Sequence, residues 1–420
     1  MTTNGRDTPN KVLITGIGPI TASGIGVDRL WAGLQGASSP VRDVTRFDVS
    51  SFRSRLAAEI EDFDPRDHME RTRARRLNRF GQFAVAATDL ALADAALQAS
   101  QLKPERVAVQ MGSALGGIIQ AEEEFPKFLS KGLKSVSPRL ALGVFCGAAS
   151  CNVAIEFGFT GPNSTNAMSC ASGAIAIGDA WRRIRAGAVD VAVAGGIEAP
   201  LGPLSFGAFS LIRAMSARNH EPSKACRPFD EDRDGFVMGE GACVLILESE
   251  AHAQARDAYV YAEIMGFATS NDAHHMAAPR PDGAEAARAM AEALAIGEVA
   301  PDEVDYVNAH GSSTPLNDAT ETRVIHSVLG DWADNVLVSG TKPYYGHALG
   351  ASGAIEAGIC ALTIERGWVA PTLNLDARGE GCDLDYVGNE GREATVSTAV
   401  TNSFGFGGIN ASLSLRAFSG

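Results

Sequence analysis

The sequence predicts an α/β protein whose two similar halves share one core. Short apolar runs that end in glycine or polar residues alternate with helical patterns along the chain. The strongest helical patterns, 80–97 and 283–297, each follow one strand-like run and precede another. This repetition indicates an internal duplication with a break near 250–258. Because no long Pro/Ser-rich linker lies there, we expect residues 1–256 and 257–420 to pack as one body.

The predicted strands share one form, a buried run that ends where the chain turns polar or glycine-rich: 11–21, 106–117, 189–200, 259–272, 304–314, 335–342 and 398–416. Ligand sites in α/β folds gather at the carboxyl ends of strands. A further helix is predicted directly after Cys170, because Ile177, Trp181 and Ile184 fall at i, i+4 and i+7 and Gly187 follows. We therefore look for functional side chains at strand ends and at the start of this helix.

Composition excludes several classes of protein. A net charge of −14 over 420 residues argues against bulk binding of nucleic acid. No apolar run reaches the roughly 18 residues that a membrane span needs, and MTTNGRDTPNK lacks the apolar core of a signal peptide. We expect a cytoplasmic protein. The seven cysteines show no spacing typical of zinc, and most are expected to be buried and reduced.

Cys170 is the cysteine whose surroundings suggest chemistry. It precedes the predicted helix in NAMSCASGA, and the partial positive charge of a helix N-terminus favours a thiolate and lowers the pKa of a thiol. The small residues Ala171, Ser172 and Gly173 would let a substrate approach closely. Taken alone, the segment would fit an inert buried cysteine equally well.

Two histidines and a lysine in the second half could complete a site with Cys170. His310 in YVNAHGSST and His347 in KPYYGHALG each follow a predicted strand and lie among small residues. Neutral imidazole N–H groups can donate to a carbonyl oxygen that becomes an enolate. Lys342, five residues before His347, would favour that negative charge, and Glu321 could pair with this lysine.

The glycine-rich segment NSFGFGGIN (402–410) surrounds Phe406 with residues that allow unusual backbone conformations. A free N–H there could join the Cys170 N–H in an oxyanion hole. A simple β-bulge would explain the segment if it occurred alone.

Together these segments resemble the β-ketoacyl-acyl-carrier-protein synthases, in particular the elongation type with a Cys-His-His site. The similarity runs from VLITGIG (12–18) to NSFGFGGIN and includes GPNSTNAMSCASGA, RPFDEDRDGFVMGEGA (227–242), NAHGSSTPLND and TKPYYGHALGASGAIE. Ordered segments at family spacing are more specific than any single motif. The resemblance implies the thiolase fold, with two similar halves in a five-layered αβαβα arrangement, and usually a homodimer.

The resemblance also implies the reaction, a decarboxylative condensation of an acyl group with malonyl-ACP in fatty-acid or type II polyketide-like biosynthesis. Cys170 would carry the acyl group, and His310 and His347 would bind the malonyl thioester while CO2 leaves. Lys342, with Glu321 as its partner, would organise the charge. No cofactor is implied, because the substrates arrive on the phosphopantetheine of acyl carrier protein (ACP).

Further positions follow from the same resemblance: an oxyanion hole (N–H of Cys170 and Phe406), an acyl pocket and its gate (Leu115, Phe209, Phe406), pantetheine contacts (Ser312, Thr314) and carrier-protein docking (Arg75, Arg76, Lys134, Arg213). On composition alone, the basic run 71–79 would fit a solvated helix face. Some relatives hold a structural cation. Asn308 and Glu356 match two of its ligands, while Thr401 replaces a serine.

The chain departs from the family pattern around the second histidine. Pro343, Tyr344 and Tyr345 stand where a serine and small or apolar residues are common, and Ile409 replaces a threonine. We hypothesise that the tyrosines near the active-site loop make this a pathway-specific synthase. The alternative is a subunit of a heterodimeric ketosynthase pair whose partner sets chain length. A degradative thiolase would need a second cysteine near the C-terminal glycine run, and a priming synthase would have asparagine in place of His347.

Overall fold

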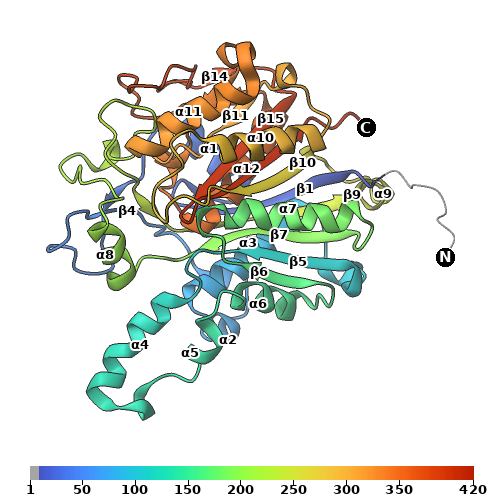
Figure 1. Cartoon of the computed structure of the whole chain (residues 1–420). Helices are drawn as coiled ribbons and strands as arrows, with labels where there is room; N and C mark the ends of the chain where they lie inside the picture. Colours follow the sequence, from blue (N-terminus) through green and yellow to red (C-terminus); the bar gives the residue numbers. More distant parts are fainter. Residues whose placement is uncertain (1–8) are drawn as a thin grey trace.

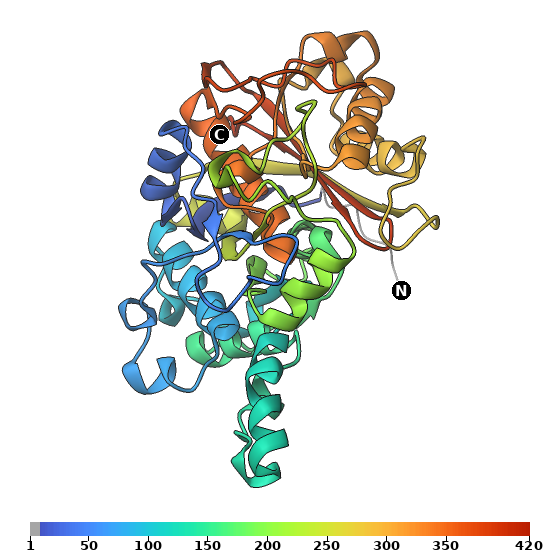
Figure 2. The same cartoon turned by 90° about the vertical axis from the view of Figure 1, so that its left-hand side faces the viewer.

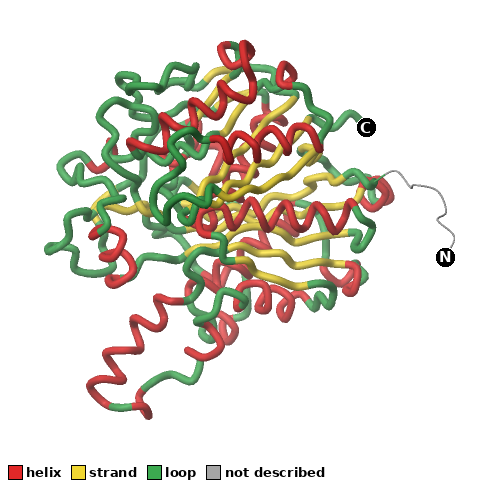
Figure 3. Tube along the Cα trace, in the orientation of Figure 1, coloured by secondary structure: helices red, strands yellow, loops and turns green. Residues whose placement is uncertain are grey.

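Ten strands lie in one mixed sheet, and an eleventh, β2 (Gly24–Ile25), pairs with β1 at its side (Figure 1, Figure 3). The computed structural model describes residues 9–420. The expectation that the N-terminal segment is not a signal peptide falls largely on residues 1–8, which lie outside the described residues. Across the sheet the strands follow the order β12 (Leu337–Ser339), β11 (Tyr306–Asn308), β15 (Thr398–Gly405), β16 (Ile409–Arg416), β10 (Ala262–Asn271), β1 (Val12–Thr21), β9 (Gly241–Ser249), β7 (Val191–Glu198), β5 (Val107–Gly112) and β6 (Asn163–Asn166).

The two sides of this sheet repeat one strand order. From the centre outward, β1, β9, β7, β5 and β6 correspond to β10, β16, β15, β11 and β12. In both sets the first two pairings, counted from the centre, are antiparallel. The two outer pairings are parallel. The sets meet where β1 pairs with β10. The same order twice is the arrangement that a duplicated unit produces.

Helices cover the sheet and connect its strands (Figure 1). They are α1 (Val27–Gln35), α2 (Arg71–Ala74), α3 (Arg79–Asp94), α4 (Ile118–Lys131), α5 (Leu140–Gly143), α6 (Ala148–Phe157), α7 (Ser172–Arg185), α8 (Pro203–Leu211), α9 (Glu250–Ala255), α10 (Ala284–Ile296), α11 (Pro315–Leu329) and α12 (Ser352–Arg366). Small sheets are formed by β3 (Arg42–Asp43), β4 (Leu56–Ala58) and β8 (Met238–Gly239), and by β13 (Trp368–Val369) and β14 (Arg392–Glu393). The helices predicted over 80–97, over 283–297 and after Cys170 are confirmed as α3, α10 and α7.

Helices α7 and α12 approach each other closely because small residues face one another. A Cβ atom on Gly173 would lie 2.9 Å from the Ala354 nitrogen, and one on Gly353 would lie 3.0 Å from the Ala174 nitrogen. Cys170 comes just before α7, and His347 comes just before α12. This contact therefore brings the start of each helix, and with it each of these side chains, to one place.

Each predicted run contains a strand, but the run 398–416 forms a hairpin of two strands, β15 and β16, that turns through the glycines. The central strand β9 was not predicted. Its side chains are buried on both faces, so its sequence GACVLILES has no alternation to mark a strand. Within residues 9–420 all seven cysteines are free and five are buried, which confirms the expectation of mostly buried, reduced thiols. No helix in this range is long and apolar enough to cross a membrane.

Candidate active site

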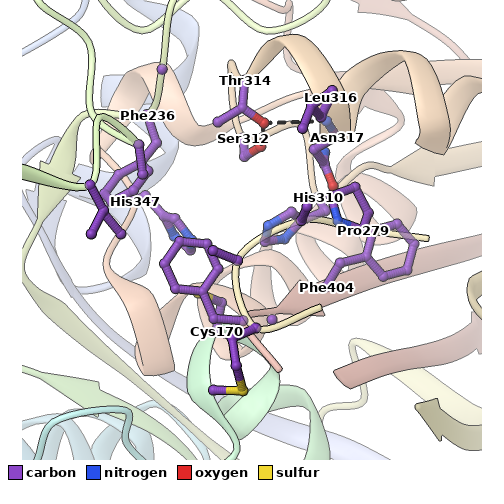
Figure 4. A pocket seen from close by; sticks show the side chains of 18 of the residues that line it. Cys170, Phe236, Pro279, His310, Ser312, Thr314, Leu316, Asn317, His347 and Phe404 are labelled. Carbon is purple, nitrogen blue, oxygen red and sulfur yellow. Dashed lines mark hydrogen bonds between the residues drawn. The ribbon is translucent and has the colours of Figure 1, made fainter. Parts of the chain in front are cut away.

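One cavity of about 380 Å³ brings together the side chains that the sequence predicts to act jointly (Figure 4). Cys170, His310, His347 and Phe406 all line it. Cys170 follows β6 at one edge of the sheet, whereas His310, His347 and Phe406 follow β11, β12 and β15, the three strands nearest the other edge. The close contact of α7 with α12 joins these two sides of the sheet and is the physical reason that residues far apart in sequence meet here.

Cys170 lies in a constrained turn at the bottom of the cavity. It is 7% exposed, and Ser169 before it has a positive φ of 52°, which is uncommon for a residue with a side chain. The Phe406 N–H hydrogen-bonds the thiol sulfur, and Ser169 Oγ lies 3.8 Å from that sulfur. A Cβ atom on Gly405 would lie 3.2 Å from the Cys170 nitrogen, so the glycine-rich turn packs directly against the nucleophile.

The predicted lowering of the Cys170 pKa is wrong. Burial raises the pKa of this thiol to about 11, against the opposing effects of the Ser169 hydroxyl, the Lys342 charge and the Phe406 N–H. The helix does begin directly after Cys170, as predicted, but removal of the sulfur from water outweighs its local surroundings. The resting side chain is a protonated thiol at neutral pH.

Alkylation of Cys170 should therefore accelerate with pH well above the usual range of a cysteine. Because only the thiolate reacts, inactivation by iodoacetamide is expected to rise about tenfold per pH unit between pH 7 and 9.5 without levelling. The measurement is the pseudo-first-order inactivation rate, with Cys170→Ala reporting background labelling at exposed Cys151. A plateau below pH 8.5 would contradict the assigned direction of the shift.

The two histidines face each other across the cavity. Their ring centroids lie 5.3 Å apart with the planes at 81°, and Figure 4 shows both imidazoles directed into the same space. Burial, followed by the Lys342 charge, lowers the pKa of both rings well below the usual range of histidine. Both imidazoles are therefore neutral at pH 7, as a pair of uncharged hydrogen-bond donors requires.

Lys342 fixes the tautomer of His310. Its Nζ lies 3.5 Å from His310 Nδ1 and also donates to the His310 carbonyl. Because an ammonium group can only donate, Nδ1 accepts and the ring proton stays on Nε2. His347 Nδ1 lies 2.9 Å from Ser352 Oγ, a hydroxyl that can donate to it and would then leave the ring proton on Nε2 there too.

The predicted ion pair between Lys342 and Glu321 is wrong. Lys342 Nζ lies 2.5 Å from Glu356 Oε1 on α12, and both side chains are completely buried. Glu321, on α11, instead accepts the backbone N–H groups of His310 at 2.8 Å and Gly311 at 2.9 Å, and burial raises its pKa to about 7. Glu321 thus braces the backbone that carries His310, while Glu356 neutralises the lysine.

Three buried oxygen atoms fit the structural cation that the resemblance implies. Asn308 Oδ1, Glu356 Oε2 and Thr401 Oγ1 find no hydrogen-bond partner among residues 9–420. Asn308 and Thr401 are paired in register on β11 and β15. Such oxygens are ligands of hard cations, and threonine supplies the same hydroxyl as the serine it replaces. These residues would hold the cation, whose charge would stabilise the carboxylate of Glu356.

The predicted acyl pocket is only partly lined as expected. Phe209 and Phe406 line the cavity, and their rings stack with centroids 6.1 Å apart. Leu115 is not among the described residues that line it, but packs into the apolar cluster that contains Cys170 and Phe209. Leu115, Phe209 and Cys170 thus belong to one apolar cluster, and of these three only Phe209 and the buried Cys170 reach the cavity.

Three of the residues predicted to contact pantetheine and carrier protein line the cavity, and three lie elsewhere on the surface. Ser312 and Thr314 line the cavity, with their hydroxyl oxygens 2.9 Å apart (Figure 4). Arg213 is exposed and also lines the cavity. The other predicted docking residues are exposed at the end of α2 and in the loop after α4: Arg75, Arg76 and Lys134.

The two tyrosines do not reach the substrate cavity. Tyr344 and Tyr345 are completely buried, pack in the main apolar core, and are not among the described residues that line the cavity. Neither tyrosine therefore touches a substrate in this cavity, and the hypothesis of a pathway-specific synthase stays a prediction. The sequence places them near His347, but the short 3-10 turn Lys342–Tyr344 directs their side chains away from it.

Glu198 is a residue of the site that the sequence analysis missed. Its buried carboxyl accepts the N–H groups of Ala114 at 2.6 Å, Leu115 at 3.0 Å and Gly350 at 3.0 Å, and burial raises its pKa to about 7. It ties the Leu115 loop to the segment after His347. The sequence does contain a signal for it, because the buried strand VAVAGGIE ends in an acidic residue. A buried carboxylate must be compensated by hydrogen bonds or an opposite charge.

Comparison with known proteins agrees with this site. Residues 9–253 match the model described as beta-ketoacyl synthase, N-terminal domain, and residues 261–376 match the C-terminal domain of the same family. The chain therefore belongs to the β-ketoacyl synthase family, which confirms the resemblance drawn from its motifs. It is 43% identical to a 3-oxoacyl-[acyl-carrier-protein] synthase 2 from Synechocystis sp., over 97% of this chain and 98% of that relative.

Two solved ketosynthase structures are also similar over nearly the whole chain. One is AntDE:AntF, a type II PKS acyl-carrier protein in complex with its ketosynthase bound to the hexaketide, at 34% identity and a TM-score of 0.91. The other is the ishigamide ketosynthase/chain length factor, at 34% identity and a TM-score of 0.92. Each covers 98% of this chain and 100% of its own.

Proposed function

We propose that this protein elongates acyl chains on ACP by decarboxylative condensation with malonyl-ACP. The observation that carries the proposal is the pair of neutral imidazoles, His310 and His347, that share one cavity with the buried thiol of Cys170. The names of the relatives support the same reaction class.

In the first half-reaction, Cys170 Sγ attacks the acyl thioester carbonyl. The N–H groups of Cys170 and Phe406 would stabilise the oxyanion, because the glycine-rich turn holds them on the same side of the sulfur. The carbon–sulfur bond to pantetheine then breaks, and the thiol proton of Cys170 ends on the pantetheine sulfur. A protonated resting thiol suits this exchange, since one thiol replaces another.

In the second half-reaction, malonyl-ACP binds with its thioester carbonyl between the two Nε2–H groups. The bond to the carboxylate breaks, CO2 leaves, and the electron pair forms an enolate held by His310 and His347. The enolate carbon attacks the acyl carbonyl on Cys170, the carbon–sulfur bond breaks, and the sulfur takes one proton from solvent. The buried Lys342 charge favours the enolate.

A direct test is acyl transfer to the enzyme. After incubation with acyl-ACP, intact-mass and peptide mass spectrometry should locate one acyl group on Cys170. Addition of malonyl-ACP should discharge that group and form 3-oxoacyl-ACP with release of CO2. A correctly folded protein that forms no adduct on Cys170 would refute the proposed function.

Carrier-protein docking at Arg213 is part of the proposal. Arg213 is exposed at the cavity that receives pantetheine, and an acidic ACP would be attracted by this charge. We expect Arg213→Glu to raise the KM for acyl-ACP about tenfold or more at low salt and to leave acylation by a small acyl-pantetheine thioester unchanged. Arg288→Glu, at another exposed position on α10, is the matched control. An equal effect of both variants would contradict docking at Arg213. The other residues proposed for docking, Arg75, Arg76 and Lys134, would extend the same basic surface.

A homodimer is the assembly we propose. The hairpin of α4 and α5 projects from the body (Figure 2) and exposes large apolar side chains, among them Leu129, Leu133 and Leu142. Strand β6 leaves one edge of the sheet open, and a second copy pairing there would cover both features. Sedimentation of the purified chain as an active dimer would support this assembly. A monomer that condenses only with a second, different chain would favour the heterodimeric alternative, which the ketosynthase/chain length factor structure also represents.

The thiolase layering αβαβα and the halves 1–256 and 257–420 belong to the proposal as well. The repeated strand order and the close contact of α7 with α12 support them. An experimental structure without these two helices between two sheets would refute the layering. Whether the pathway makes fatty acids or polyketides is a question of substrate, which a panel of saturated, unsaturated and aromatic acyl-ACPs would decide.

A further inference from the structure

We propose that Tyr345 is a positioning residue that holds Lys342 against His310 through Glu356. This inference rests on the proposed condensation. Tyr345 is completely buried, and its hydroxyl lies 3.1 Å from Glu356 Oε1. The same carboxylate oxygen accepts Lys342 Nζ at 2.5 Å. The tyrosine and the lysine thus share one acceptor atom.

The hydrogen bonds around Tyr345 have a fixed direction. An ionised carboxylate can only accept, so the Tyr345 hydroxyl donates to Glu356. Thr341 Oγ1, 2.9 Å from that hydroxyl, must then donate to it, and Asn308 Nδ2 in turn donates to Thr341 at 3.4 Å. The chain runs from Asn308 at the end of β11 to the carboxylate on α12, and each group donates to the next.

This chain determines where the Lys342 ammonium lies. Glu356 is buried, and its Oε1 accepts from two donors, Lys342 and Tyr345. The second donor, Tyr345, fixes Oε1 in the orientation that also leaves Lys342 Nζ at the His310 carbonyl and 3.5 Å from His310 Nδ1. A displaced ammonium would no longer impose the His310 tautomer or stabilise the enolate, so we expect the effect of Tyr345 to fall mainly on the malonyl half-reaction.

The neighbouring Tyr344 provides a matched control. It is also completely buried, but its hydroxyl finds no hydrogen-bond partner within the described part of the chain. Tyr344→Phe and Tyr345→Phe therefore remove the same atom from adjacent, equally buried side chains, and only the second breaks a hydrogen bond. Loss of a bond to a charged group should be felt, whereas loss of an unpaired hydroxyl should not.

The experiment separates the two half-reactions. Transfer of acyl groups from acyl-ACP to Cys170 is followed by rapid quench and mass spectrometry, and the pre-acylated enzyme is then mixed with malonyl-ACP in a single turnover. For Tyr345→Phe we expect the condensation rate at saturating malonyl-ACP to fall about 5- to 20-fold, with acyl transfer within twofold of wild type. For Tyr344→Phe we expect both rates to remain at the wild-type value.

Wild-type condensation by Tyr345→Phe, or an equal slowing of both half-reactions, would overturn the inference. If Tyr345→Phe does not fold, Thr341→Val serves instead, because it removes the donor to the Tyr345 oxygen while Tyr345 stays in place. It should slow condensation selectively by a smaller factor, and a wild-type rate would overturn the inference equally. A wild-type enzyme that never acylates Cys170 would refute the proposed function instead.

Discussion

Replacement of Cys170 with glutamine should lower condensation at least about 10³-fold, because the variant cannot hold the acyl group as a thioester. The glutamine side chain ends in an amide of similar size to a thioester group. Its carbonyl can point toward the backbone N–H groups of residue 170 and Phe406. His310, His347 and Lys342 are untouched by the change, so decarboxylation of malonyl-ACP should continue. The measurement compares 3-oxoacyl-ACP formation with CO2 release from malonyl-ACP in the absence of an acyl donor.

Cys151→Gln is the control for this variant. Cys151 is exposed on α6, outside the cavity lining, so both activities should match wild type. Condensation by Cys170→Gln at more than a tenth of the wild-type rate would show that another group carries the acyl chain. Loss of decarboxylation together with condensation would place Cys170 in the malonyl half-reaction, which the geometry of the two imidazoles does not require.

The proposed catalytic groups could be predicted from sequence because each lies at a local pattern visible along the chain, the end of a strand for His310 and His347 and the start of a helix for Cys170. The contact of α7 with α12 then brings Cys170 and His347, which precede these two helices, to one place. The strand β9 escaped prediction because its continuous apolar run is shared by buried strands and buried helices. Local pattern thus finds the ends of elements but does not identify every element at the centre of a sheet.

Interactions that depend on side-chain direction could not be predicted in the same way. Glu321 lies on the helix that follows His310, and Glu356 lies on the helix that follows His347. Only the packing of α12 decides that Glu356 is the partner of Lys342. The pKa of Cys170 is a similar case, since the helix after it is a local feature whereas its burial comes from the whole fold. Tyr345 lies two residues from His347, yet its hydroxyl bonds Glu356, the partner of Lys342, and not the histidine.

Replacement of His310 with alanine should lower decarboxylation of malonyl-ACP by about 10²- to 10³-fold, the range found when one donor to a developing oxyanion is removed. Acylation of Cys170 should continue, because the proposed role of His310 is donation to the malonyl carbonyl and not to the acyl thioester. The test measures CO2 release from malonyl-ACP and, separately, acyl transfer to Cys170. His220→Ala, at an exposed position, is the control that should leave both rates unchanged.

The structure gives a reason to expect that His310→Ala folds. Lys342 donates to the His310 backbone carbonyl and pairs with Glu356, and neither contact involves the imidazole. Glu321 likewise holds the backbone N–H of His310 and not its side chain. The variant therefore removes one neutral donor while the buried charges stay compensated. Decarboxylation at the wild-type rate would leave His347 as the sole donor, whereas loss of acyl transfer would place His310 in the first half-reaction.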